Sequence, residues 1–162
     1  MATESRRTRA GGATLGYGIV LLGAALFVVS CFLPYQGFPV SFPDQTASLY
    51  DLLTIGPGSD LGSLLQLFGG VTPVAVVAIV ALAGGERRAV LPSLLVGAVL
   101  AWSLTWGGFL LNQGTYRGAS LEIGFWLLAV SIGVAVIGTI LVTARRAGAH
   151  ERQGEPSDPD AA

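Results

Sequence analysis

The side chains that could carry out chemistry are few in this sequence, and they lie far apart. Its only histidine is His150, beyond the last apolar segment, and its only cysteine is Cys31. A histidine-assisted nucleophile or a zinc site needs histidine or cysteine side chains in combination, and thiol–disulfide exchange needs a second cysteine. A glycine-rich phosphate loop is also missing. We therefore expect no enzymatic activity and no cofactor.

Three aspartates, Asp44, Asp51 and Asp60, are the only charged residues between the first two apolar segments. Their wide spacing lacks the dense alternation of oxygen ligands that a calcium loop needs. Asp51 instead completes the capping pattern that begins at Ser48, just before an apolar run. We therefore expect no metal site here.

Polar side chains are rare inside the apolar segments themselves. Gln66 lies in the second segment, and Glu122 lies in the first turn of the fourth. A proton-coupled transporter places acids, histidines or arginines along its path, and these segments offer none in their interior. Gln66 favours a hydrogen bond between helices. Glu122 fits the positive end of a helix dipole, with Arg117 as a potential ion-pair partner.

Four apolar segments must position these residues. The chain has 162 residues, of which 52% are hydrophobic and 12% are charged, whereas about 25% are charged in a typical soluble protein. A helix needs about 20 apolar residues to cross a bilayer, where a helix satisfies all of its backbone groups. The sequence therefore predicts an all-α membrane protein, a four-transmembrane-helix antiparallel bundle. The predicted spans are residues 14–33, 61–83, 90–111 and 121–143.

Arginine placement predicts the orientation of these spans. All nine basic residues are arginines, and eight of them lie before the first span, between the second and third, or after the fourth. Only Arg117 lies in the other two connections. Basic residues accumulate on the cytoplasmic side, so both termini are predicted to be cytoplasmic and the loop 34–60 to be external. A net charge of −1 also argues against nucleic acid as a partner.

The segments outside the membrane have their own composition. The loop 34–60 begins with aromatic–proline pairs, which favour an extended chain, and then fits a short helix on the outer membrane surface. The tails 1–13 and 144–162 are polar and lack apolar periodicity, which predicts disorder. The use of arginine without lysine, with abundant alanine and glycine, is typical of high-GC bacterial genomes. The predicted location is therefore the bacterial cytoplasmic (plasma) membrane.

Small residues recur at a spacing of four on the last two spans. The third span has Ser93, Gly97, Ala101 and Thr105, and the fourth has Ser131, Ala135, Thr139 and Thr143. Membrane helices associate by close packing through such residues. Since a short external connection joins these spans, we predict that the two ridges face each other. In the second span, Pro73 follows Gly69-Gly70 by one turn, which predicts a kink.

The three tryptophans all fall in the outer halves of their spans. Trp106 fits an aromatic belt at the membrane surface, whereas Trp102 and Trp126 lie deeper and are expected to fill the core of the bundle. An alternative interpretation is that Gln66 and the three tryptophans line a surface for an apolar ligand or a partner.

A second interpretation concerns Cys31. The segment Val28-Val29-Ser30-Cys31 has the residue types of a bacterial lipobox, which would remove the first span and lipidate Cys31. Against this, the apolar stretch exceeds the 7–15 residues of a signal peptide core and continues through the cysteine as Phe32-Leu33.

Two short motifs resemble a group of small four-span proteins of high-GC, actinobacterial-type bacteria. They are Cys31-Phe32-Leu33-Pro34-Tyr35, where the first span ends in a proline and an aromatic residue, and Gly124-Phe125-Trp126-Leu127 at the start of the last span. The resemblance implies a shared architecture and supplies no activity or site residue.

The functional interpretation that these patterns favour is a structural or accessory protein. It would lie in the lipid bilayer and pack against another membrane protein or a second copy of itself. The alternatives are a carrier or sensor of an apolar or lipidic ligand, and a lipoprotein with three remaining spans.

Overall fold

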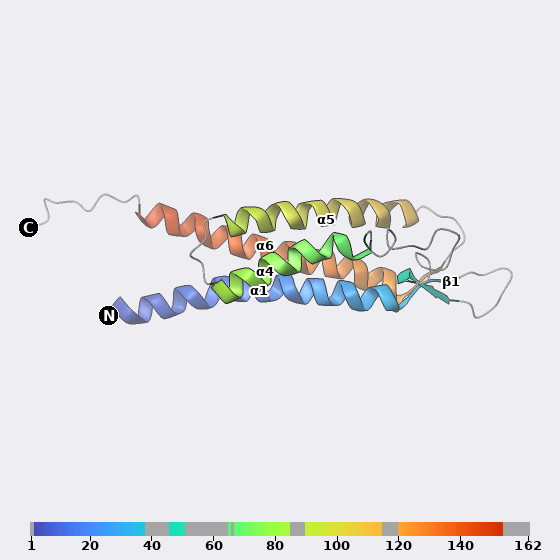
Figure 1. Cartoon of the computed structure of the whole chain (residues 1–162), viewed down its shortest axis with the longest axis horizontal. Helices are drawn as coiled ribbons and strands as arrows, with labels where there is room; N and C mark the ends of the chain where they lie inside the picture. Colours follow the sequence, from blue (N-terminus) through green and yellow to red (C-terminus); the bar gives the residue numbers. More distant parts are fainter. Residues whose placement is uncertain are drawn as a thin grey trace, which may run out of the picture.

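The computed structural model describes residues 2–37, 46–50, 65, 67–84, 90–114 and 120–153. Figure 1 shows the long helices side by side along the longest axis, with the short strands at one end. The helices are α1 (Ala2–Phe32), α4 (Val71–Gly84), α5 (Leu91–Gly114) and α6 (Ile123–Gln153), and the strands are β1 (Pro34–Gly37), β2 (Thr46–Ser48) and β3 (Ser120–Leu121).

Four helices are long and apolar enough to cross a membrane. These stretches are Thr14–Phe32, Leu67–Gly84, Leu91–Leu111 and Ile123–Arg145, which agrees with the four predicted spans to within a few residues at most ends. Large apolar side chains cover their outward faces; Leu104, for example, is 75% exposed and Ile140 is 56% exposed. Such faces are unfavourable in water and favourable against lipid tails. The chain therefore has the form of a multi-pass membrane protein.

The closest helix pair is α1 with α6. A Cβ atom added at Gly23 would lie 2.8 Å from the backbone oxygen of Ser131 and 2.9 Å from the backbone nitrogen of Ala135. A Cβ atom added at Gly138 would lie 2.8 Å from the backbone oxygen of Gly16. Early residues of α1 therefore meet late residues of α6, so these two helices run in opposite directions. Glycine lets their backbones touch, which is the usual basis of helix association in lipid.

The small-residue ridge of α6 faces α1. Ser131, Ala135 and Thr139 are buried, and the first two lie against Gly23 of α1. Their hydroxyl groups are satisfied within α6: Ser131 Oγ donates to the backbone oxygen of Leu128 at 2.7 Å, and Thr139 Oγ1 donates to that of Ala135 at 2.9 Å. The ridge can therefore pack closely without leaving a polar group unpaired.

The corresponding ridge of α5 faces outward, so the prediction that the two ridges face each other is wrong. Ser93, Gly97, Ala101 and Thr105 are all exposed. A Cβ atom added at Gly97 would meet nothing within 4 Å. The helix instead turns large side chains inward at Leu95, Val99, Trp102 and Trp106, which are all buried. A short connection makes two helices neighbours but does not determine the rotation of either helix about its own axis.

The second span is interrupted at Gly70, which forms a turn between helical residues 67–69 and the start of α4 at Val71. Pro73 thus occupies the first turn of α4, where the missing N–H is tolerated. Thr72 Oγ1 donates to the backbone oxygen of Phe68 at 2.7 Å across this interruption. The structure places the break one turn before the proline rather than at it.

A three-stranded antiparallel sheet, in the order β2-β1-β3, lies at the end of the bundle (Figure 1). Pro34 of β1 pairs with Ser48 of β2, and Gln36 pairs with Leu121 of β3. The predicted extended conformation is confirmed over residues 34–37, although the sheet itself was not predicted. Asp44, Asp51 and Asp60, and most of the predicted surface helix, lie outside the described residues.

Both terminal helices continue beyond the membrane spans. The structure has helix from Ala2 in α1 and as far as Gln153 in α6, which differs from the prediction of disorder in both tails. The physical reason is that a helix that already exists extends at low cost, because nucleation is the expensive step, and alanine and arginine favour helix. Residues 154–162 lie outside the described part of the chain.

Candidate functional site

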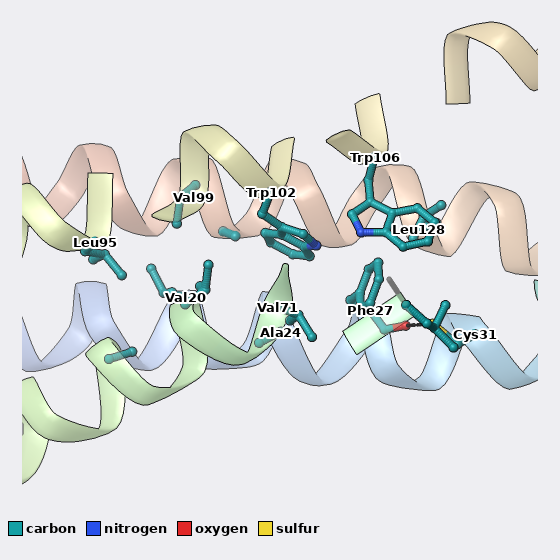
Figure 2. Close-up of a cluster of buried hydrophobic side chains, with 14 of the residues drawn as sticks. Val20, Ala24, Phe27, Cys31, Val71, Leu95, Val99, Trp102, Trp106 and Leu128 are labelled. Carbon is teal, nitrogen blue, oxygen red and sulfur yellow. Dashed lines mark hydrogen bonds between the residues drawn. The ribbon is translucent and has the colours of Figure 1, made fainter. Parts of the chain in front are cut away.

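A column of aromatic rings begins in the middle of the bundle. The ring of Phe27 on α1 lies 5.2 Å from that of Trp102 and 5.1 Å from that of Trp106, both on α5, with interplanar angles of 79° and 65°. Figure 2 shows the two indoles side by side, with Phe27 between them and α1. Edge-to-face pairs of this kind are favourable beyond the area that they bury. Spacing by four residues places both tryptophans on one face of α5.

The column continues toward the sheet. Trp106 contacts Phe109 at 5.3 Å, Phe109 contacts Tyr35 of β1 at 5.9 Å, and Tyr35 contacts Phe125 of α6 at 5.7 Å between ring centroids. Rings from α1, α5, β1 and α6 therefore form one continuous contact path. This path ties the strands to the helices beneath them.

Trp102, Trp106 and the neighbouring Ser103 have buried polar side-chain atoms without a hydrogen-bond partner in the described structure. Trp102 is 1% exposed and Trp106 is 3% exposed, and neither Nε1 atom has a hydrogen-bond partner in the described structure. By contrast, Ser30 Oγ donates to the backbone oxygen of Phe27 at 2.7 Å. An indole nitrogen is a donor only, and a buried donor without an acceptor costs about 1–3 kcal/mol.

The two indoles meet at Gly70, Trp102 through its Cδ1 and Cγ atoms and Trp106 through Nε1. A Cβ atom added at Gly70 would lie 3.1 Å from Trp102 Cδ1, the neighbour of Nε1 in the ring, and 3.7 Å from Trp106 Nε1. In Figure 2 both nitrogen atoms face the gap between the rings, beside Phe27. A larger residue at position 70 would enter this space. The neighbouring Gly69 meets nothing within 4 Å, so the close approach is specific to Gly70.

The structure brings together only part of the predicted aromatic surface. Trp102 and Trp106 are adjacent and buried, whereas Trp126 is 60% exposed, so the prediction that Trp126 fills the core is wrong. Phe125 and Leu128 of α6 point inward, and the helical rotation of about 100° per residue turns Trp126 outward. Gln66 lies outside the described residues.

Tyr35 is a member of the column that sequence reasoning missed. Its side chain is fully buried and its hydroxyl has no partner in the described structure. Burial raises the pKa of Tyr35 to about 12, because the charged phenolate is poorly solvated there. Its backbone oxygen accepts a hydrogen bond from the backbone nitrogen of Glu122 at 3.2 Å, at the start of α6. The sequence signal was its position directly after Pro34, where the first span ends.

Cys31 is fully buried, and its Sγ donates to the backbone oxygen of Phe27 at 3.2 Å. Lipidation would require removal of the part of α1 that holds Phe27 and Gly23, with loss of the close packing on α6. The lipoprotein interpretation stays a prediction.

Two other expectations concern charged groups. In the described part of the chain, no three histidine, cysteine, aspartate or glutamate residues cluster in a way that could hold a metal ion. Arg117, the potential partner of Glu122, lies outside it. Within the aromatic column, the polar side-chain atoms that the structure describes are the neutral indole nitrogens of Trp102 and Trp106 and the hydroxyl of Tyr35.

Comparison with models of protein families, with curated proteins and with solved structures found no match. Two features of the structure bear on the function of this protein. One is the outward ridge of α5, and the other is the pair of unpartnered indole donors beside Gly70.

Proposed function

We propose that this protein is an accessory protein of the bacterial cytoplasmic membrane, which binds a transmembrane helix of another membrane protein through the outer face of α5. In this proposal the four spans form an antiparallel bundle with both termini in the cytoplasm. We propose no catalytic activity.

The orientation is supported by charge and by geometry together. The first turn of α1 and the last turn of α6 lie at the same end of the molecule, opposite the strands (Figure 1). Arg6, Arg7 and Arg9 are in α1 near that end, and Arg145 and Arg152 are in α6. Arginines at one end of a set of spans favour the cytoplasmic side for that end.

The outer face of α5 is the observation that carries the proposal. The ridge of Ser93, Gly97, Ala101 and Thr105 is exposed, and α5 is the least buried of the four spans. Thr105 Oγ1 donates to the backbone oxygen of Ala101 at 2.9 Å, so its hydroxyl needs no outside partner. Exposed Leu100 and Leu104 stand beside the ridge. The result is a shallow path of small residues next to large ones.

A second helix fits such a path better than lipid tails do. Small residues at a spacing of four let two helix backbones approach closely, and the dispersion attraction between their closely packed atoms is a main source of helix association in lipid. The same kind of surface, on α6, is covered by α1 in this protein.

The test is photocrosslinking in native membranes from a reactive residue placed at Ala101. We expect a crosslinked product of defined mass that disappears when Gly97 is also changed to leucine. The matched control is Gly133→Leu, because Gly133 on α6 is also exposed and meets nothing within 4 Å. A product at twice the mass of the chain would identify a second copy as the partner. A reactive residue placed at Gly133 serves as a second control. Crosslinking to lipid alone, and equally from Ala101 and from Gly133, would contradict the proposal.

A further inference from the structure

The indole pair points to a function beyond helix association. Two indole side chains that are both more than nine-tenths buried lie beside Gly70 and turn their nitrogen atoms toward the gap between the two rings (Figure 2), and neither donor has an acceptor in the described structure. Tryptophans that serve only to fill a core normally place Nε1 against an acceptor. We propose that Trp102, Trp106 and Gly70 form a binding site for the carbonyl oxygen of an uncharged, apolar molecule taken up from the lipid.

The chemistry of the donors selects the ligand. An indole N–H can only donate, and a carbonyl oxygen has two lone pairs and no hydrogen. One carbonyl oxygen can therefore accept from both tryptophans and leave no polar group unpaired. A water molecule at the same place would have to donate two hydrogens of its own. The surroundings that the structure describes are the ring of Phe27 and the apolar side chains of Val71 and Leu128 (Figure 2).

The surroundings also exclude charged ligands. The contacts of the two indoles that the structure describes are with Phe27, Phe109 and Gly70, and a charge placed among them would lose its hydration without a counter-ion. An ester carbonyl of a neutral lipid and a ring carbonyl of a lipid-soluble quinone are both uncharged acceptors on a large apolar body. They share the chemistry that the two donors recognise.

The backbone turn at Gly70 is the part of the site that we expect to move when a ligand oxygen enters. The span is interrupted there, with helical residues on both sides of the turn, and helices bend where the backbone ladder is broken. Thr72 Oγ1 crosses the break to the backbone oxygen of Phe68. The absence of a side chain at position 70 lets the backbone lie close to both indoles, so in this proposal the turn at Gly70 moves away from them when a ligand oxygen enters.

The experiment follows the three indole N–H groups by nuclear magnetic resonance. The full chain is labelled with nitrogen-15 tryptophan, purified in a maltoside detergent and titrated with dioleoylglycerol or with phylloquinone; hexadecane, which has no carbonyl group, is the control. Each signal is assigned by its loss in a Trp→Phe variant, which keeps an aromatic ring and removes the donor. Trp126 is the internal control, since it is exposed on α6.

We expect the proton signals of Trp102 and Trp106 to move downfield with at least one carbonyl probe, while that of Trp126 stays in place. Hexadecane should leave all three unchanged. In Trp102→Phe, the Trp106 signal should report binding that is about tenfold weaker, because one hydrogen bond is lost. A response to dioleoylglycerol alone assigns an ester carbonyl, and a response to phylloquinone alone assigns a quinone.

Several results would overturn the inference. One is unchanged Trp102 and Trp106 signals with both carbonyl probes, and another is an equal response to hexadecane. A cross-peak between these indole protons and water before any probe is added would show that water occupies the place. Indole protons that are downfield at the outset and move upfield in Gln66→Leu would show that the acceptor belongs to the chain. Failure of the α5 crosslinking test would leave this inference untouched, since the two sites use different faces of α5.

Discussion

At the scale of single residues, this protein is defined by neutral polar groups in apolar places. Several serine and threonine hydroxyls on α1, α4, α5 and α6 return their hydrogen bonds to their own helices, as Ser30 and Thr139 do. Trp102, Trp106 and Tyr35 do not, and their donors stay unpartnered in the described structure. Because such donors reduce stability, the presence of two of them on adjacent rings, Trp102 and Trp106, is the residue-level reason to propose a ligand.

A substitution at Tyr35 can separate the cost of an unpartnered buried hydroxyl from the contribution of ring packing. In Tyr35→Phe the ring contacts with Phe109 and Phe125 are kept and the unpartnered hydroxyl is removed. We expect unchanged or higher stability at neutral pH, by up to about 1 kcal/mol, measured by thermal unfolding in detergent.

The same variant should change the alkaline limit of stability. The pKa of Tyr35 is raised from 10.0 to about 12 in the folded protein, so the folded state holds this proton more tightly than the unfolded state does. The contribution of this tightly held proton to the free energy of unfolding is complete below pH 10 and is lost as the pH rises through 12. Unfolding followed from pH 9 to pH 12 should therefore be less steep in Tyr35→Phe than in the wild type. Equal slopes would contradict the buried phenol.

At the scale of elements, the pair α1–α6 is the tightest contact, and α5 is the most loosely held span. The backbones of α1 and α6 touch at Gly16, Gly23 and Gly138. This pair lies beneath the sheet, where a Cβ atom at Gly124 would be 2.7 Å from the backbone oxygen of Pro34. The closest backbone contacts thus join the first and last helices, whereas the ridge on the outer face of α5 is exposed.

Alanine substitutions at glycine should show how closely α1 and α6 are packed. In Gly23→Ala the added Cβ would lie 2.8 Å from a backbone atom, which only a movement of the whole helix can relieve. We expect a loss of about 3 kcal/mol, at the upper end of the cost of overpacking. Gly133→Ala on α6, where nothing lies within 4 Å, should be neutral or slightly stabilising. Both are measured as thermal unfolding in the same detergent, and equal destabilisation would contradict the α1–α6 contact.

At the scale of the whole molecule, four apolar helices and a one-sided distribution of arginine are the basis of the proposed orientation in the membrane. Positively charged residues in short connections oppose translocation, and the ends of α1 and α6 that carry arginines lie together (Figure 1). In the proposed orientation, the three strands lie on the opposite side. Each proposed function requires this arrangement, because a partner helix and a lipid ligand both approach from within the bilayer.

The orientation can be measured by cysteine labelling in cells. In a Cys31→Ser background, a single cysteine at Ser5 or at His150 should react with a membrane-impermeant maleimide only after the membrane is permeabilised. A cysteine at Asp44 should react from outside in intact cells. Labelling of positions 5 and 150 from opposite sides would exclude an even number of spans.

Some of these properties were determined by the sequence itself. The existence and approximate limits of four helices follow from local composition, because each segment meets lipid on its own, and a helix of about 20 apolar residues is the simplest way to satisfy its backbone there. The extended conformation after Pro34 follows equally from proline. The helices depend on no contact with the rest of the chain, whereas β1 is also held by its pairing with β2 and β3.

Only the tertiary structure decided which faces meet. The spans are apolar on nearly all sides, so hydrophobic periodicity cannot distinguish a lipid-facing side from a core-facing one. The ridges of α5 and α6 look alike in sequence, yet Ala135 lies against Gly23 of α1 while Gly97 faces outward. In the same way Trp102 is buried and Trp126 is exposed. In lipid, these contacts depend on how well the surfaces of two helices fit each other. That fit involves residues that are distant in sequence, so it cannot be determined from one helix alone.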